Sequence, residues 1–331
     1  MTATTSSPAT LPTAEPITAR AAVQHAFGGP SAIAIEDVTL PAPGPGQVIV
    51  RTSAAGINPV DLKTSEGGGI AGMLPAGVLD AGLTLGWDLA GYVVTTGEGV
   101  TAFQPGDRVF GLIGFPALGR TFADRVLVAA EDITPIPPHV SDVVAGAIPL
   151  VGLTAWQALF DHAGLQAGQT LLLHGGTGGV GHVAIQLAKQ AGAQVIVTAS
   201  ARNREFLLGL GADEVIDYRT QRFEELVSDV DVVFNTVEGD ALDRSWQVLR
   251  PGGIIVSILA VPEVPAEAPE GARGQHVFVH ASGREMAELA TLLAAGTLSP
   301  SIQRTGGLDE LPALFEDLDG GHVIGKLVVT F

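Results

Sequence analysis

The 331-residue sequence contains no cysteine, which excludes disulfide bonds, thiolate-ligated metal centres and cysteine nucleophiles. Positive charge is also scarce: 17 Lys and Arg oppose 35 Asp and Glu, and the formal net charge at pH 7 is −18. A surface this acidic repels phosphate backbones and anionic lipid headgroups. Neither a nucleic acid nor a membrane surface is therefore an expected partner.

Long apolar runs are missing as well. No stretch approaches the ~20 apolar residues that a membrane-spanning helix needs. Residues Met1–Pro16 are rich in Thr, Ser, Ala and Pro, and they lack the basic start and apolar centre of a signal peptide. We therefore expect residues 1–17 to form a disordered tail and the protein to be cytoplasmic.

What is present indicates an α/β protein with two domains, because 331 residues exceed what one core usually organises, and 43 of them are glycine. Residues 18–138 show short apolar alternations, such as Gln47–Arg51 and Leu89–Val94, broken by Gly and Pro. This spacing predicts a β-rich barrel or sandwich. The residue pattern changes near Ser141, and a long apolar helix is expected from about Asp142 to His162.

Strand-like and helix-like segments then alternate, which predicts a doubly wound parallel sheet. The expected strands are Leu171–His174, Val195–Ala199, Glu214–Tyr218, Val232–Val237, Ile254–Leu259 and His276–His280. The expected helices include Val180–Ala191, Arg204–Leu210 and Arg284–Ala295, and the last expected strand is Lys326–Phe331. The segment Val261–Gly274 is predicted to be a mobile loop.

A glycine-rich loop, Gly176-Thr177-Gly178-Gly179-Val180-Gly181, lies between the first of these strands and its helix. In this context the spacing predicts a dinucleotide site: Gly176 permits a tight turn, Gly178 lets a pyrophosphate approach the backbone, and Gly181 allows close helix–strand packing. An ordinary glycine-rich turn is the alternative.

The next strand distinguishes between the two nicotinamide cofactors. An NAD site usually has an acid at this strand's end, whereas here Ser200, Arg202 and Arg204 follow it and the first acid is Glu205. A hydroxyl and two guanidinium groups suit the 2′-phosphate of NADPH. The alternative is a solvated helix start.

Together with these features, seven short segments in order resemble the medium-chain dehydrogenase/reductase superfamily, in its zinc-free quinone oxidoreductase and alkenal reductase branch. The segments are Ala54–Asp61, Gly86–Gly91, Pro105–Gly111, Gly152–Trp156, His174–Gly181, Leu210–Asp213 and Gly321–Lys326.

The resemblance implies a Rossmann domain over residues 139–281 and a GroES-like domain over residues 18–138, completed by residues 282–331, with the active site between them. It implies a homodimer joined at the Rossmann sheet edge near His276–His280. It also assigns further residues to the NADPH site, and these are Thr154, Tyr218, Asn235, Thr236 and Lys326. Relatives often carry a Lys for the 2′-phosphate where this chain has Asn203, so Arg202 or Arg204 would substitute.

Zinc-dependent members have Cys where this chain has Asn58 or Pro59, and Gly-His-Glu where it has Gly86-Trp87-Asp88. A catalytic zinc needs about three N, S or O ligands, and neither position offers Cys or His. His276 and His280 would lie ~13 Å apart along a strand, too far for one metal. We therefore expect no metal.

Without a Lewis acid, reduction of a quinone or of a C=C bond beside a carbonyl is easier than alcohol oxidation. By resemblance, Asn58, Asp61 and Lys63 lie at the cleft. Lys63 is the candidate for binding the substrate carbonyl or the cofactor ribose, and a solvent-facing lysine is the alternative. No tyrosine is free to donate a proton, so the proton is expected to come from water.

Trp87, Phe110 and Phe115 could wall the site, although core positions are favoured for Trp87 and Phe110. The sequence thus predicts a zinc-independent, NADPH-dependent reductase of quinones or α,β-unsaturated carbonyl compounds. The alternatives are a dedicated enoyl or ene reductase of a secondary-metabolite pathway and a non-catalytic NADPH-binding sensor.

Overall fold

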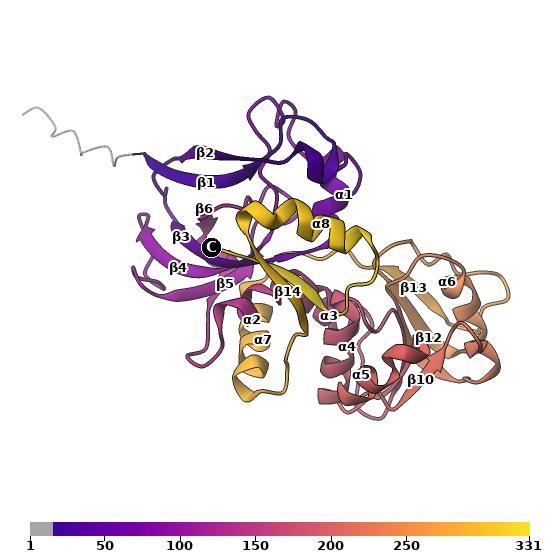
Figure 1. Cartoon of the computed structure of the whole chain (residues 1–331). Coiled ribbons are helices and arrows are strands. Elements are labelled where there is room, and N and C mark those ends of the chain that lie inside the picture. The colour runs from indigo at the N-terminus through magenta and orange to yellow at the C-terminus, as the bar shows by residue number, and fades with distance from the viewer. Residues whose placement is uncertain (1–15) are drawn as a thin grey trace, which may run out of the picture.

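The computed structural model of the chain describes residues 16–331, which form two lobes around two large sheets (Figure 1). Of the tail expected over residues 1–17, residues 1–15 lie outside the described part, and Ile17 already begins a strand. No helix among the described residues is long and apolar enough to cross a membrane.

The first lobe is built around the long strand β3 (Gln47–Ile57), whose inward-facing residues are almost all buried. Its sheet has the order β14-β15-β3-β4-β5-β7, with β6 also paired to β3. The strands are β4 (Asp88–Thr96), β5 (Arg108–Leu112), β6 (Arg125–Ala129), β7 (Ile133–Pro135), β14 (Ile302–Gly307) and β15 (Lys326–Thr330). A hairpin of β1 (Ile17–Val23) and β2 (Ala34–Leu40) and the short helix α1 (Pro59–Ser65) complete this lobe.

The second lobe contains a parallel sheet in the order β10-β9-β8-β11-β12-β13, as expected for a doubly wound fold. Its strands are β8 (Thr170–His174), β9 (Gln194–Ala199), β10 (Glu214–Asp217), β11 (Val230–Asn235), β12 (Leu249–Ser257) and β13 (Arg273–His276). Its connections carry α4 (Gly179–Gln190), α5 (Arg204–Gly209) and α6 (Ala241–Arg244). Because the sheet is covered on both faces, β8, β9 and β11 are nearly continuous apolar runs.

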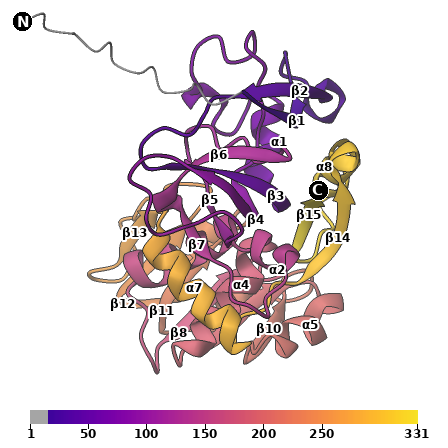
Figure 2. The ribbon, with the colours of Figure 1, turned by 90° about the vertical axis from the view of Figure 1, so that its left-hand side faces the viewer.

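The final part of the chain returns to the first lobe. Helix α7 (Gly283–Ala295) begins at Ser282, whose hydroxyl accepts a hydrogen bond from the Glu285 amide, and ends at Gly296 with φ 70°. Strand β14 and helix α8 (Leu311–Asp319) follow, and β15 then pairs antiparallel with β3. Figure 2 shows this yellow segment alongside the indigo and magenta strands of the first lobe.

Three sequence expectations are corrected here. The long helix expected from Asp142 to His162 is three pieces: α2 (Asp142–Gly146), α3 (Pro149–Trp156) and a π-helical turn over Gln157–His162. Pro149 has no amide hydrogen to donate to the carbonyl four residues earlier, so it interrupts a continuous helix. Helix α2 therefore ends before Pro149, and α3 begins with Pro149 as its first residue.

The strand expected over His276–His280 is also wrong, because β13 ends at His276. Among the described strands β13 pairs with β12 alone, and β12 ends at Ser257, the partner of His276 in the ladder. The loop expected over Val261–Gly274 ends two residues early, where Arg273 begins β13.

The apolar core is continuous across the boundary between the lobes. Trp87 and Phe110 are completely buried, which confirms the expectation that they belong to the core. Phe115 packs edge-on against Trp87 with ring centroids 5.5 Å apart and also reaches a cavity described below.

Gly91, on β4, lets the backbones of β3 and β4 lie close together. A Cβ added there would lie 2.1 Å from the Arg51 carbonyl oxygen, so the backbone would have to move. We expect Gly91→Ala to lower the free energy of unfolding by about 3 kcal/mol, as overpacking against backbone does. Urea unfolding followed by tryptophan fluorescence measures this change. Gly72→Ala is the control, because a Cβ at Gly72 meets nothing within 4 Å; an equal loss in both variants would contradict the prediction.

Candidate active site

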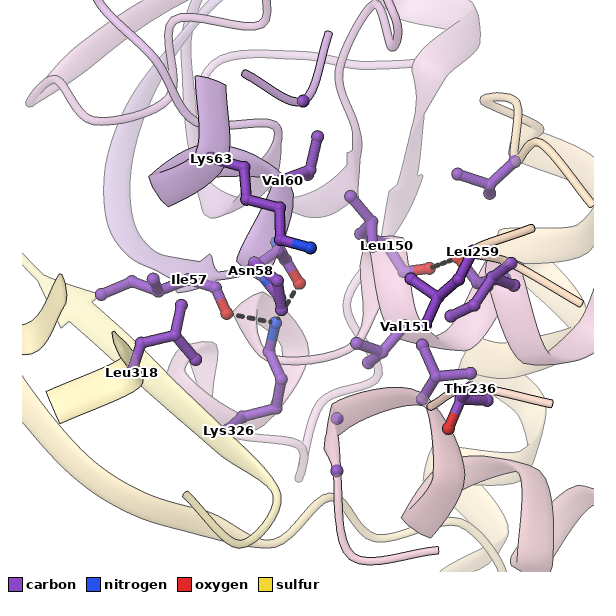
Figure 3. A pocket seen from close by; sticks show the side chains of 18 of the residues that line it. Ile57, Asn58, Val60, Lys63, Leu150, Val151, Thr236, Leu259, Leu318 and Lys326 are labelled. Carbon is purple, nitrogen blue, oxygen red and sulfur yellow. Dashed lines mark hydrogen bonds between the residues drawn. The ribbon is translucent and has the colours of Figure 1, made fainter. Parts of the chain in front are cut away.

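A cavity of about 590 Å³ lies between the two lobes. The first lobe contributes the end of β3, helix α1 and Phe115, and the second contributes α3, the start of α4 and the chain after β11 and β12. The start of β15 and the end of α8 close a third side. Figure 3 shows labelled side chains from these elements converging on one space, with Lys63 directed into it from α1.

The glycine loop forms one wall of this cavity through Gly178, Gly179 and Val180. The positive φ of the turn belongs to Gly175 (88°) rather than to Gly176, whose Cβ would instead strike Val197 at 2.4 Å. A Cβ at Gly181 would lie 2.2 Å from the Gly175 carbonyl oxygen, so this glycine does permit close helix–strand packing. The Thr177 carbonyl accepts a hydrogen bond from the Gly325 amide at 2.9 Å, which ties the loop to the start of β15.

The loop geometry fits a dinucleotide pyrophosphate. A Cβ at Gly178 would meet only the Gly175 carbonyl oxygen, at 3.6 Å, so the space above this residue is open toward the cavity. Helix α4 has no side-chain cap, and its first amides have no intrahelical acceptors. The first turn of this 12-residue helix thus presents free N–H groups and a partial positive charge to the cavity wall.

Two threonines line the cavity next to this loop. The Thr154 hydroxyl donates to the Leu150 carbonyl at 2.7 Å, and the Thr236 hydroxyl donates to the His174 carbonyl at 2.7 Å. Asn235 is buried just before Thr236, with its amide nitrogen bonded to Val237 and its Oδ1 atom without a partner.

The residues expected at the 2′-phosphate lie around the ends of β9 and β10. The Ser200 hydroxyl accepts a hydrogen bond from the Asn203 amide at 3.2 Å, and both residues are buried. The Arg204 guanidinium points back to the Val215 carbonyl at 2.6 Å. Arg202 is exposed.

Exposed Tyr218 follows β10, and the Arg219 guanidinium lies 5.9 Å from the centre of its ring. Sequence reasoning did not single out Arg219, although it directly follows Tyr218.

The floor of the cavity holds a buried ion pair between Lys326 and Asp88. The resemblance assigned Lys326 to the NADPH site, whereas its pairing with Asp88 was not predicted. The Lys326 Nζ atom donates to the Ile57 carbonyl at 2.8 Å and to Asn58 Oδ1 (Figure 3). It also donates to Asp88 Oδ2 at 3.3 Å. All three ammonium hydrogens therefore have protein acceptors. Burial raises the pKa of Asp88 and lowers the pKa of Lys326, and each charge partly offsets the effect of burial on the other.

Asp88 also connects the two lobes. Its Oδ1 atom accepts a hydrogen bond from the Leu150 amide at 2.7 Å, in the first turn of α3. Its Oδ2 atom accepts from Asn58 Nδ2 at 3.0 Å as well as from Lys326. The signal in the sequence was a single acid inside the apolar stretch Leu83–Ala90 and a single lysine at the start of an apolar strand.

Asp61 lies in the first turn of α1 and does not reach the cavity surface. Its Oδ2 atom accepts from the Asn58 amide at 2.7 Å, and its Oδ1 atom is buried without a partner. Burial, together with the nearby Asp88 carboxylate, raises the pKa of Asp61 to about 8. The carboxyl group is thus held mostly neutral at pH 7.

Lys63, the third residue expected at the cleft, lines the cavity, and its ammonium lies 3.3 Å from Glu238 of the second lobe. Glu238 is another residue that sequence reasoning missed. Phe278, on the chain after β13, packs against Phe115 with ring centroids 5.6 Å apart and extends the aromatic wall. Among residues 16–331, no three His, Cys, Asp or Glu side chains gather in a way that could hold a metal ion.

Comparison with known protein families gives two matches. A family described as "Alcohol dehydrogenase GroES-like domain" matches residues 44–138, and one described as "Zinc-binding dehydrogenase" matches residues 210–329. Together they cover parts of both lobes.

Individual relatives extend the likeness over nearly the whole chain. The chain is 32% identical over 334 residues to a 2-haloacrylate reductase of Burkholderia sp, and the match covers 93% of this chain and 98% of that protein. It is 36% identical over 301 residues to the spectinabilin polyketide synthase system protein NorB of Streptomyces orinoci, covering 86% of this chain but only 13% of that much longer protein. The structure of a quinone oxidoreductase from Coxiella burnetii superposes with a TM-score of 0.83 at 33% identity, covering 95% of this chain and all of that one (100%).

The raised pKa of Asp61 has a consequence for stability. An unfolded Asp titrates near pH ~3.9. Between about pH 4 and pH 8 the folded chain therefore binds one more proton than the unfolded chain, and its stability falls as the pH rises. Asp61→Asn can keep the bond from the Asn58 amide without this loss. We expect the drop in unfolding free energy from pH 5 to pH 8 to be smaller in the variant, by up to about 4 kcal/mol.

Urea unfolding of both proteins at the two pH values measures this difference. The control is Asp80→Asn, which removes an exposed carboxylate of the same lobe. Parallel pH dependence in wild type and Asp61→Asn would refute the assignment.

Proposed function

The chain belongs to the medium-chain dehydrogenase/reductase superfamily of oxidoreductases, which bind a nicotinamide cofactor, and on this premise we propose that it is a zinc-independent NADPH-dependent reductase. Its acceptor would be a quinone or the C=C bond of an α,β-unsaturated carbonyl compound. The observation that carries the proposal is one cavity that joins the free N-terminus of α4 to an apolar wall containing Lys63.

The reduced nicotinamide supplies the hydride when the cofactor is bound. Gly178, Gly179 and the α4 amides would hold its pyrophosphate, and Thr154 and Thr236 lie where the cavity continues from that loop toward α1. Exposed Arg202, Tyr218 and Arg219 would bind the 2′-phosphate, because the end of β9 carries no acid to bind a free ribose.

The acceptor would lie against Phe115 and Phe278, with its carbonyl toward Lys63. An ammonium beside the carbonyl oxygen stabilises the negative charge that develops there as hydride reaches the β-carbon. Asn58 holds the Lys326 ammonium in place, and Asp61 in turn holds the Asn58 backbone at the start of α1. The proton would come from water that enters the cavity.

The residue types at the buried ion pair favour zinc-independent chemistry. The oxygen atoms of Asn58, Asp88 and Ile57 that face one another there already accept hydrogen bonds from Lys326. A lysine ammonium thus provides the positive charge at this point of the fold, and none of the three residues that accept its hydrogen bonds is a cysteine or a histidine. We also propose a cytoplasmic homodimer joined along the β13 edge.

A dedicated enoyl reductase of a biosynthetic pathway is the second candidate. The 36% identity to a segment of a polyketide synthase protein favours it. Broad activity on simple quinones and enones supports the first candidate, and activity confined to acyl thioesters supports the second.

We expect the purified protein to oxidise NADPH in the presence of 1,4-benzoquinone or an alkyl enone, and to do so equally well after dialysis against a chelator. Absorbance of NADPH over time measures the rate. Lack of turnover with quinones, enones and enoyl thioesters alike would contradict a reductase function, and loss of activity after chelation would contradict zinc independence.

Arg219→Gln tests the 2′-phosphate site. Loss of one guanidinium from the phosphate should raise KM for NADPH about ten-fold, which corresponds to ~1.4 kcal/mol, and leave KM for NADH within about two-fold. Arg51→Gln is a matched control, because Arg51 is also exposed and also lies over a tyrosine ring, 5.1 Å from the centre of Tyr92 in the other lobe. Equal changes for NADPH and NADH would count against the assignment.

A further inference from the structure

The lining of the cavity has an unusual charge pattern for a chain with a formal net charge of −18. Among the lining residues in the described part of the chain there is no carboxylate, and the charged ones are two lysines, Lys63 and Lys326. The remaining lining is mostly apolar. Taken alone, this lining would attract an anionic acceptor.

The two lysines are not equally available to a ligand. Lys326 is buried, and its ammonium already donates to Ile57, Asn58 and Asp88. Lys63 is half-exposed, with 52% of its side chain accessible, and among residues 16–331 its ammonium bonds to one partner, Glu238. Lys63 is therefore the cation that an acceptor in the cavity would meet.

Glu238 approaches Lys63 from the opposite lobe. It lies on the turn after β11, directly before Gly239, whose φ of 98° gives the turn its direction. Its Oε1 atom is 3.3 Å from Lys63 Nζ, and 79% of its side chain is accessible. Thr236, two residues earlier, lines the cavity, so the Glu238 carboxylate lies at the rim rather than on the wall.

We propose that Glu238 is a specificity-determining residue that neutralises Lys63 and thereby favours uncharged acceptors over anionic ones. The proposal rests on the proposed function and narrows its substrate class to neutral quinones, enones or esters. An acceptor with a carboxylate near Lys63 has to displace Glu238 or lie beside it, and like charges a few ångströms apart repel one another. A neutral carbonyl accepts a hydrogen bond from Lys63 without that repulsion.

A matched pair of acceptors tests the proposal: trans-4-oxopent-2-enoate and its methyl ester, which differ in one negative charge. With NADPH as donor, Glu238→Gln should raise kcat/KM for the acid about three- to ten-fold, mainly through a lower KM, as expected for a partly exposed charge pair. The value for the ester should stay within about two-fold. Added salt should narrow the gap between acid and ester in the wild type, because exposed charges are screened.

Glu288→Gln is the control, since it removes an exposed carboxylate on α7 and leaves the cavity lining unchanged. A gain for the acid in both variants would mean that overall charge is responsible and would overturn the proposal, as would equal gains for acid and ester in Glu238→Gln.

A binding measurement distinguishes failure of the proposed reductase function from failure of the role proposed for Glu238. Calorimetry measures the affinity of the protein with NADP⁺ for the saturated analogues, 4-oxopentanoate and its methyl ester. If the wild type reduces neither of these acceptors nor any quinone, other enone or enoyl thioester, the proposed function fails, while the binding data still decide the role of Glu238. Selectively tighter binding of 4-oxopentanoate to Glu238→Gln supports that role, and unchanged relative affinities refute it.

Discussion

The burial of the Lys326 ammonium among three oxygen acceptors is the contact on which the site depends. Removing one partner of a buried ion pair costs about 3–5 kcal/mol, whereas replacing the whole pair by apolar groups is often neutral. We therefore interpret this pair as a device that fixes geometry. It sets the end of β3 against the start of β4 and the start of β15, and through Asp88 it also holds the first turn of α3. The four elements thus share a single anchor, and three of them, β3, β15 and α3, line the cavity.

The site is composite for a simple physical reason. The parallel sheet offers a helix N-terminus and strand ends, which suit a phosphate-bearing ligand. It offers little to enclose a second, apolar molecule. The first lobe supplies that enclosure through α1 and Phe115, and the chain after β12 and β13 supplies the opposite wall with Leu259 and Phe278.

Local signals in the sequence were enough to predict the α/β fold class, the β8–loop–α4 unit and most strands of the parallel sheet. Glycine spacing and apolar runs act over a few residues, so they can be interpreted without the fold. The helix expected over residues 142–162 failed because apolar content outweighed Pro149 in the prediction. Lys326–Asp88 and Lys63–Glu238 could not be predicted, because their partners are 238 and 175 residues apart in the chain and meet only through tertiary packing.

The pairing of β15 with β3 also limits the order in which the two lobes can fold while the chain is being synthesised. Strands β8 to β13 are contiguous in sequence, so the ribosome releases the whole parallel sheet as one uninterrupted stretch. The first lobe is made earlier, yet its sheet and its buried lysine must wait until residues 326–330 emerge. Until then Asp88 has no ammonium beside it. A nascent chain has therefore released every strand of the parallel sheet while the first lobe still lacks its last strand.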